Sequence, residues 1–379
     1  MRRLLLVATA VLATTASAAV ARELAYKPSP LLAIDGAYRL SDGTLASVAV
    51  TPDGGLLYTD TRTGDLRQLE PDGPSRWHFG PAYLVRRPVR GTVTVRGTRL
   101  TVATAANTRT GPRVAVKRRR VAFRGGGVRI VGKVTVPVTP GRHPGIVIVH
   151  GSEASDRDGH DLFVNFFTSL GYVVLSYDKR GVGDSGGVYV ERATIENIEN
   201  HARDTVAALR VLAARKDVDA KRLGLVGGSQ GGWIIPRVAA LSPLVAFAVV
   251  TSGPPMSVGE QDAYATITGG GGIEPPPSDA AIREQLAAAE PSGFDPRPDL
   301  DSLDIPTLWL YGSEDKSVYV RQSVEVLQAL DPAPTITVFP GAGHFILDTP
   351  HGLTSEIPKA HRFAPGLFGA IAGWLSRLP

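Results

Sequence analysis

Ten residues, LGLVGGSQGG at positions 223–232, set the organisation of the whole chain. Their first half is a short apolar run typical of a buried strand, and the residues that follow, WIIPRVAAL, favour a helix. A G-x-S-x-G motif between a strand and a helix predicts a sharp turn at Ser229. We expect glycine to be required at Gly227 and Gly231, because a Cβ atom there would crowd the strand against the helix.

This turn makes Ser229 a candidate nucleophile. It lifts the hydroxyl above the edge of the sheet, and the helix N-terminus beneath it favours the oxyanion of an acyl intermediate. The alternative is a glycine-rich loop that holds a phosphate. That loop needs the spacing G-x-x-x-x-G-K-[ST], which this sequence lacks.

The first 21 residues have the pattern of a secretory signal peptide. Arg2 and Arg3 precede an apolar run, and small residues allow cleavage after Ala18 or after Ala21. Threonines and a serine interrupt the run, which disfavours an uncleaved membrane span. The sequence therefore predicts a secreted or periplasmic protein with no stable membrane anchor after processing.

Composition excludes several other classes. With 43% hydrophobic and 20% charged residues the chain is typical of a soluble globular protein. It has no cysteine, which excludes disulfides, a cysteine nucleophile and cysteine-ligated metals. The formal charge of +5 is concentrated in the run KRRR at 117–120, which has no interleaved aromatic residues. We interpret this run as a solvated strand or linker and expect no nucleic-acid partner.

The chain divides into two regions after the signal peptide. Residues 22–120 contain short strands separated by turn signals, which predicts a small antiparallel β region. Residues 121–379 alternate apolar strands with helices, which predicts an α/β fold with a doubly wound, mainly parallel sheet. The strands fall at about 145–149, 172–177, 223–228, 245–250, 307–311 and 335–339.

A serine nucleophile needs a base, and the base needs an orienting carboxylate. Asp315 follows the strand at 307–311 in the sequence YGSED, and we take it as the acid, with Glu314 as the competitor. His344 follows the last strand in the glycine turn PGAGHF, and we take it as the base. The order serine, acid, histidine is that of the strand-to-helix elbow motif.

Two backbone N–H groups are expected to bind the oxyanion. One is that of Gln230, directly after the nucleophile, and the other comes from the loop HGSE at 150–153. We choose Ser152 for the second donor, with Glu153 as the alternative. We interpret His150 as a loop-shaping residue, and the run DKRGVGDS at 178–185 as a turn that packs near the site.

Residues 121–379 resemble the α/β-hydrolase superfamily, since the loop at 150–152, the run at 178–185, the elbow and the sequence GAGH at 341–344 stand in the family's order. The likeness is greatest to bacterial serine esterases and acyl thioesterases that carry an extra N-terminal β region. It implies a triad of Ser229, Asp315 and His344, with Gln230 and Ser152 as oxyanion donors. Serine at position 229 excludes the dienelactone hydrolases, which need Cys there, and the haloalkane dehalogenases, which need Asp.

The function that we expect is a secreted serine esterase, which forms an acyl-enzyme on Ser229 and needs no cofactor or metal. Its partner would be a small-molecule ester with a short to medium acyl chain; the oligomeric state stays open. Alternatives are an acyl-CoA thioesterase, which export disfavours, a prolyl-peptidase-like hydrolase, and a catalytically dead binding module. The last alternative conflicts with the presence of all three triad residues.

A long insertion at about 254–303 is expected to cap the pocket. It contains GGGG at 269–272 and PPP at 275–277, which predicts an irregular start, and one helix from about 278 to 290. A single amphipathic helix offers little apolar wall. We therefore expect the best substrates to carry acyl groups of about two to six carbons, with a decline beyond about eight.

Overall fold

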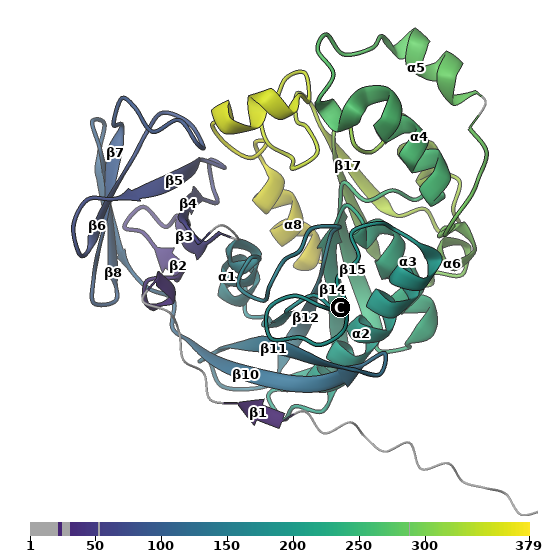
Figure 1. Ribbon diagram of the computed structural model, residues 1–379. Helices are drawn as coiled ribbons and strands as arrows, with labels where there is room; N and C mark the ends of the chain where they lie inside the picture. The colour runs from purple at the N-terminus through teal and green to yellow at the C-terminus, as the bar shows by residue number, and fades with distance from the viewer. Residues whose placement is uncertain (1–21, 25–30, 52–53, 288) are drawn as a thin grey trace, which may run out of the picture.

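The computed structural model describes residues 22–24, 31–51, 54–287 and 289–379, which form two β-sheets with helices packed on the larger one (Figure 1). The predicted signal peptide, residues 1–21, lies outside the described residues. None of the helices in the described part of the chain combines the length and the apolar character that crossing a bilayer requires.

The larger sheet confirms the predicted doubly wound, mainly parallel architecture. In the strand order given next, the pairs from β1 to β13 are antiparallel, and every pair from β13 to β17 is parallel. The strand order is β1 (Arg22–Leu24), β10 (Val116–Gly125), β11 (Val128–Pro137), β13 (Val173–Tyr177), β12 (His143–Val149), β14 (Val218–Gly228), β15 (Val245–Thr251), β16 (Thr307–Gly312) and β17 (Thr335–Phe339). The carboxyl ends of β12, β14, β15 and β16 therefore meet at one edge of the sheet.

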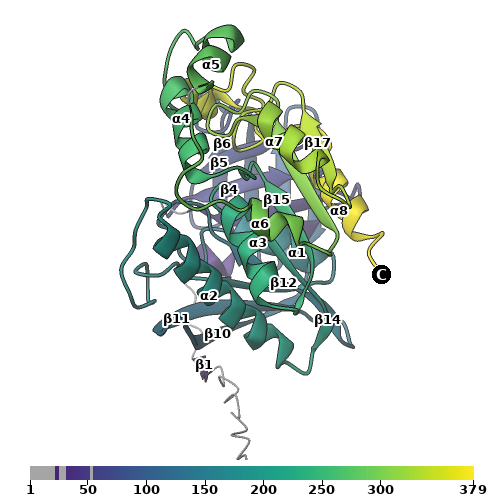
Figure 2. The ribbon, with the colours of Figure 1, turned by 90° about the vertical axis from the view of Figure 1, so that its right-hand side faces the viewer.

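Helices cover both faces of this sheet. One face packs against α1 (Asp161–Ser169) and α8 (Leu367–Leu375), and the other against α2 (Ile195–Ala213), α3 (Gly231–Leu241) and α7 (Val320–Gln328) (Figures 1 and 2). Successive residues of β12 point to opposite faces of the sheet. Ile146 and Ile148 pack in the core beneath α1 and α8, and Val147 and Val149 pack in the core beneath α2, α3 and α7. A strand segment buried on both faces has to be apolar, as residues 145–149 of β12 are.

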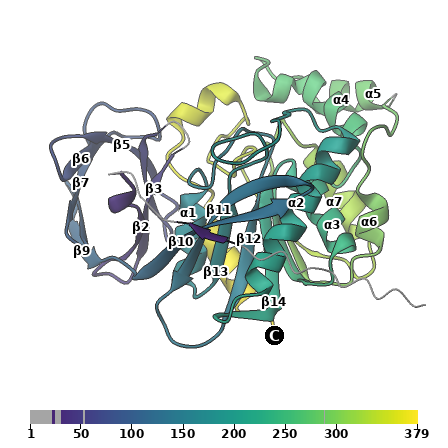
Figure 3. The same cartoon turned by 60° about the horizontal axis from the view of Figure 1, so that its bottom comes forward.

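The smaller sheet confirms the predicted antiparallel β region. After the 3-10 helix η1 (Leu31–Ala33), its strands follow one another as neighbours, and a bridge between Tyr38 and Arg113 brings its two ends together (Figure 3). Its inner face holds a separate apolar core. The strands are β2 (Gly36–Arg39), β3 (Leu45–Val50), β4 (Leu56–Asp60), β5 (Leu66–Pro71), β6 (Arg76–Phe79), β7 (Gly91–Arg96), β8 (Arg99–Thr104) and β9 (Thr108–Pro112).

The chain passes from the small sheet to the large one between the end of β9 and the start of β10. The expected boundary at residue 120 falls inside β10, because the basic run at 117–120 is part of a long paired strand. Two of its side chains have acidic partners: Arg118 lies 2.6 Å from Asp35, and Arg120 lies 2.7 Å from Asp184. The short strand β1 also pairs with β10 and so belongs to the large sheet.

The segment between β15 and β16 contains more helix than expected. It holds α4 (Val258–Thr268), the 3-10 turn η2 (Gly269–Gly271), α5 (Asp279–Leu286) and α6 (Arg297–Asp301). The expectation of an irregular start and a single helix was wrong, because α4 precedes the glycine run; the helix expected from 278 to 290 is α5 and ends at Leu286. A capping box formed by Ser257 and Glu260 starts α4, and this S-x-x-E pattern is readable in the sequence.

Candidate active site

Ser229 lies directly after β14 at the elbow that leads into α3. Its φ is 51°, in the left-handed region that side chains other than glycine rarely adopt. The turn is held by two backbone hydrogen bonds: Ser229 N–H donates to the carbonyl of Thr251 at 3.0 Å, and the Ser229 carbonyl accepts from Gly232 N–H at 2.8 Å. The backbone strain is thus maintained by its neighbours, as at many functional sites.

The glycines of the elbow differ in how strictly they are required. A Cβ on Gly227 would lie 2.7 Å from the carbonyl oxygen of Val149, as expected. The expectation for Gly231 was wrong, because a Cβ there would meet nothing nearer than 3.9 Å. The close approach falls one residue later, at Gly232, where a Cβ would lie 2.6 Å from the backbone of Gly253.

The structure brings Asp315 and His344 together on the loops after β16 and β17. The Nδ1–H of His344 donates to Asp315 Oδ2 at 2.9 Å, and the other carboxylate oxygen accepts from the N–H groups of Ser317 and Val318, both at 2.8 Å. Glu314 instead contacts Ser313 at 3.0 Å and Lys316 at 3.5 Å. Of the two candidate acids, Asp315 is therefore the one that orients the imidazole.

The environment of His344 favours its protonated form. Burial lowers the pKa of the imidazole, but the charge and hydrogen bond of Asp315, with Glu153 adding to them, raise the pKa of His344 above its ordinary value. A raised pKa makes the neutral imidazole a stronger base. It also means that the neutral base becomes available at higher pH than it would for an ordinary histidine.

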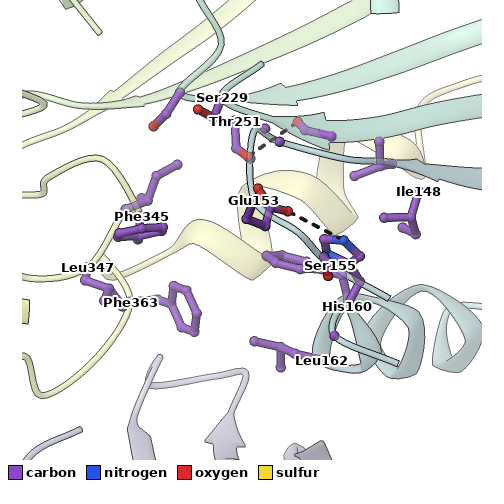
Figure 4. Close-up of a pocket in the computed structure, with 18 of the residues that line it drawn as sticks. Ile148, Glu153, Ser155, His160, Leu162, Ser229, Thr251, Phe345, Leu347 and Phe363 are labelled. Carbon is purple, nitrogen blue, oxygen red and sulfur yellow. Dashed lines mark hydrogen bonds and ion pairs between the residues drawn. The ribbon is translucent and has the colours of Figure 1, made fainter. Parts of the chain in front are cut away.

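Ser229 and His344 line the same cavity, which has a volume of about 450 Å³. Figure 4 shows Glu153 between the side of the cavity that carries Ser229 and the side that carries His160. Most of the other lining side chains are apolar. Within the described residues no hydrogen bond joins Ser229 to His344, and catalytic hydrogen bonds are often long in free enzymes.

Lys179 holds the loop that faces the elbow. Its ammonium is fully buried and donates to the carbonyls of Gly151 at 2.7 Å and Ser152 at 2.9 Å, and to the side chain of Gln230 at 3.3 Å. Because the C=O and N–H of a trans peptide point in opposite directions, the N–H groups of Ser152 and Glu153 point away from Lys179. Sequence reasoning recognised only a turn here; the signal was the charged run at 178–180.

The candidate oxyanion donors are backbone N–H groups of the elbow and of the loop that faces it. In the part of the chain that the structure describes, the N–H groups of Gln230, Ser152 and Glu153 donate to no protein acceptor. Glu153 lines the cavity and Ser152 does not, which favours the alternative donor over the first choice. The carbonyl of Ser152 also accepts from the hydroxyl of Tyr189 at 2.8 Å, so that two donors fix the peptide between Ser152 and Glu153.

Replacing Lys179 with methionine should lower kcat about ten- to a hundredfold with little change in KM, because the two peptide N–H groups lose their fixed direction. Burial lowers the pKa of Lys179 to about 8, so the kcat of the native chain should decline above that pH, and the decline should be absent in the variant. Tyr189→Phe, which removes one bond to the same peptide, is the matched control and should cost less. An unchanged kcat in folded Lys179→Met would contradict this role.

One group of side chains could in principle bind a metal ion. Ligand atoms of His150, Glu153 and His160 lie within 4.8 Å of one another. Three of the ring nitrogens already have partners within the protein: His150 Nε2–H donates to the Tyr177 carbonyl at 2.7 Å, and its Nδ1 accepts from His160 Nε2–H at 3.1 Å. Burial lowers the pKa of both imidazoles, and the charge of Lys179 adds to the effect. This arrangement gives the expected loop-shaping histidine a structural role, while the absence of a metal from the reaction stays a prediction.

The insertion supports the acid loop instead of lining the main cavity. The hydroxyl of Tyr264 on α4 donates to the Asp315 carbonyl at 2.7 Å, and Gln261 and Thr268 bond the carbonyls of Ser317 and Lys316. No described residue of 254–303 lines the main cavity. Gly270 lines a second cavity of about 190 Å³, which lies beside His344 and Thr349.

The strand order and the serine at a strand-to-helix elbow place the chain in the α/β-hydrolase superfamily, as the sequence motifs predicted. A more specific assignment comes from sequence comparison. The model of the prolyl oligopeptidase family (peptidase family S9) matches residues 160–369, more than half of the chain, and the chain belongs to this family.

Similar proteins include both esterases and peptidases. Esterase EstD of Thermotoga maritima is 32% identical over 131 residues, which cover 33% of this chain and 30% of EstD. A probable dipeptidyl-aminopeptidase B of Botryotinia fuckeliana is 25% identical over 226 residues, covering 54% of this chain and 22% of the relative. The chain thus spans less than a third of the length of these relatives. The Pyrococcus furiosus esterase Pf2001 has the same fold, with a TM-score of 0.51 at 18% identity over 70% of this chain and 92% of its own.

Proposed function

We propose that this protein is a serine hydrolase that cleaves carboxylic esters of small molecules through an acyl-enzyme on Ser229. The observation that carries the proposal is the hydrogen-bonded pair of Asp315 and His344, at 2.9 Å, in the cavity into which the strained elbow presents Ser229. The N–H of Gln230, which has no protein acceptor among the described residues, supplies an oxyanion donor beside the serine. Family membership and the esterase EstD among the relatives support the same reaction.

The reaction then follows from these positions. His344 Nε2 accepts the hydroxyl proton while Ser229 Oγ bonds to the ester carbonyl carbon, and the resulting oxyanion accepts from the N–H groups of Gln230 and of Glu153 or Ser152. His344 returns the proton to the alkoxide as the bond to the alcohol breaks. Water, activated by the same imidazole, adds to the acyl-enzyme and releases the acid and free Ser229. Asp315 keeps the proton of His344 on Nδ1 throughout.

A prolyl-peptidase-like activity is the second candidate, because the family and the dipeptidyl-aminopeptidase relative point to it. The mostly apolar lining of the cavity favours an ester, since a peptide brings several backbone polar groups that need partners. Acyl-CoA hydrolysis is disfavoured by the export signal predicted at residues 1–21.

An assay of p-nitrophenyl esters, acyl-CoAs and chromogenic peptides side by side tests the assignment. We expect kcat/KM for the best ester to exceed that for the best peptide and the best acyl-CoA by at least about tenfold. The Ser229→Ala variant is the blank, so that turnover unrelated to this site is subtracted. Faster cleavage of a peptide than of any ester would overturn the proposal in favour of the second candidate.

The proposed setting of this activity is extracytoplasmic, after removal of residues 1–21. It is supported by the basic, apolar and small-residue pattern of that segment alone. The proposal involves no cofactor, and the partner is the ester substrate.

A further inference from the structure

The main cavity has a wall that comes from the small N-terminal sheet. Ala49 on β3, Leu57 on β4 and Leu66 on β5 line it, together with Tyr83 from the loop after β6. The sequence region from about 30 to 120 contains no catalytic pair, and the structure nevertheless places it at the site. Figure 1 shows the small sheet standing beside α1 and α8, on the side away from α2 and α3.

The apolar residues of this sheet are divided between two faces. Leu56 and Tyr58 point into the inner core of the small sheet, whereas Leu57 between them joins the core formed with α1 and α8. Leu66 and Ala49 join the same core as Leu57. An apolar outer face on a small sheet is unfavourable if it is left in water. Here α1 and α8 pack against this face, and the part that they leave free lines the cavity.

The wall is attached firmly to the catalytic region. Leu66 N–H donates to the His361 carbonyl at 3.1 Å, Tyr83 N–H to the Ala360 carbonyl at 2.8 Å, and Phe363 N–H to the Gly64 carbonyl at 2.9 Å. These bonds join the small sheet to the segment between η3 (Thr354–Lys359) and α8, which also lines the cavity through Phe363. The distance between the wall and Ser229 is therefore set by the fold.

The two cavities share His344, and only the main one contains Ser229. The acyl group stays attached to Ser229, so the main cavity, which also contains the oxyanion loop residues Gly151 and Glu153, is the one that holds it. The smaller cavity contains His344 but not Ser229, and His344 is the group that protonates the leaving alcohol. Phe345, 60% exposed, lines both cavities and lies at their junction.

Resting on the proposed ester hydrolysis, we propose that the small N-terminal sheet forms the far wall of the acyl-binding pocket and that the preferred acyl group is an unbranched chain of about eight to ten carbons. The cavity volume is about 450 Å³. At about 30 Å³ for each water-sized methylene, a share that already includes the gaps between groups, this volume holds at most on the order of fifteen such groups, so a chain of about eight to ten carbons fits together with the ester group. The sequence-based expectation of shorter acyl groups rested on a pocket walled by the insertion. The described residues of the insertion do not line this cavity.

A series of p-nitrophenyl esters from acetate to tetradecanoate measures the depth of the pocket. We expect kcat/KM to rise about three- to fourfold for each added methylene until the cavity is full at eight to ten carbons, and then to level off or fall. An optimum at two to four carbons would overturn the inference while leaving ester hydrolysis intact. Absence of turnover on every ester would instead refute the proposed function itself.

Two substitutions at Leu57 test whether the small N-terminal sheet forms the far wall of the acyl-binding pocket. Leu57→Trp should lower the ratio of kcat/KM for decanoate to that for acetate by at least about tenfold, since the indole occupies the end of the pocket, and Leu57→Ala should move the optimum to longer chains. Val89→Trp is the matched control, because it adds the same ring to the small sheet region at a position that is 43% exposed and outside the cavity. Thermal unfolding of each variant verifies that it is folded.

The same variants distinguish the acyl from the alcohol side. In a series of alkyl acetates with increasing alcohol length, Leu57→Trp should leave the chain-length dependence as it is in the native chain. A loss confined to the alcohol series, or a decanoate-to-acetate ratio unchanged in folded Leu57→Trp, would overturn the assignment of the N-terminal sheet to the acyl pocket.

Discussion

Replacing Ser229 with alanine should lower kcat on the best ester by at least about 10⁴-fold, since the acyl-enzyme can no longer form. The substitution removes one oxygen and keeps the Cβ, so the elbow and its hydrogen bonds to Thr251 and Gly232, which use only the backbone, are retained. A fluorophosphonate probe should label the native chain and not the variant.

Ser252 is the alternative nucleophile that the labelling experiment has to exclude. It also lines the cavity, has a positive φ of 48°, and its buried hydroxyl has no hydrogen-bond partner among the described residues. However, it follows β15 without a helix N-terminus beneath it, and it is bonded through its N–H to the Leu310 carbonyl at 2.7 Å. Labelling that persists in Ser229→Ala and disappears in Ser252→Ala would transfer the nucleophile to Ser252.

Asp315→Asn should lower kcat by about 10⁴-fold while the protein stays folded. Asp315 Oδ1 accepts from two backbone N–H groups, so the amide oxygen of the asparagine has to take that position. Its NH₂ group then faces His344 Nδ1, which can only accept from it, and the imidazole proton moves to Nε2. In that tautomer the nitrogen that has to take the serine proton is already protonated.

The pH dependence of the remaining activity separates this effect from a loss of structure. Because burial lowers and Asp315 raises the pKa of His344, removing the carboxylate charge should shift the acidic limb of the pH profile to lower pH. Glu314→Gln is the control, because among the described residues the Glu314 carboxylate bonds Ser313 and Lys316 and not His344; the substitution should leave both the rate and the acidic limb of the pH profile nearly unchanged. If Glu314→Gln lost the activity and Asp315→Asn kept it, the acid would have been assigned incorrectly.

The local features of the fold were the predictable ones. The strand, the glycines and the helix around Ser229 are adjacent in sequence, and the steric limits on a residue between them act over a few bonds. The same is true of α4, whose capping box was present in the sequence but not used. The partial error at the elbow has a different origin: the backbone that comes close belongs to Gly253, after the next strand, so the glycine that it requires is Gly232.

By itself, the sequence determined the superfamily and the order of Ser229, Asp315 and His344, because alternating strands and helices in a parallel sheet bring successive strand ends to one edge. Only the tertiary structure decided what encloses that edge. The sequence LLY at 56–58 marks an apolar strand, but it does not show what covers Leu57: a helix, a second sheet or a substrate. In the structure, Leu57 lines the same cavity as Ser229. The two residues lie far apart in the sequence, and the packing of the small sheet against the large domain brings them to one cavity.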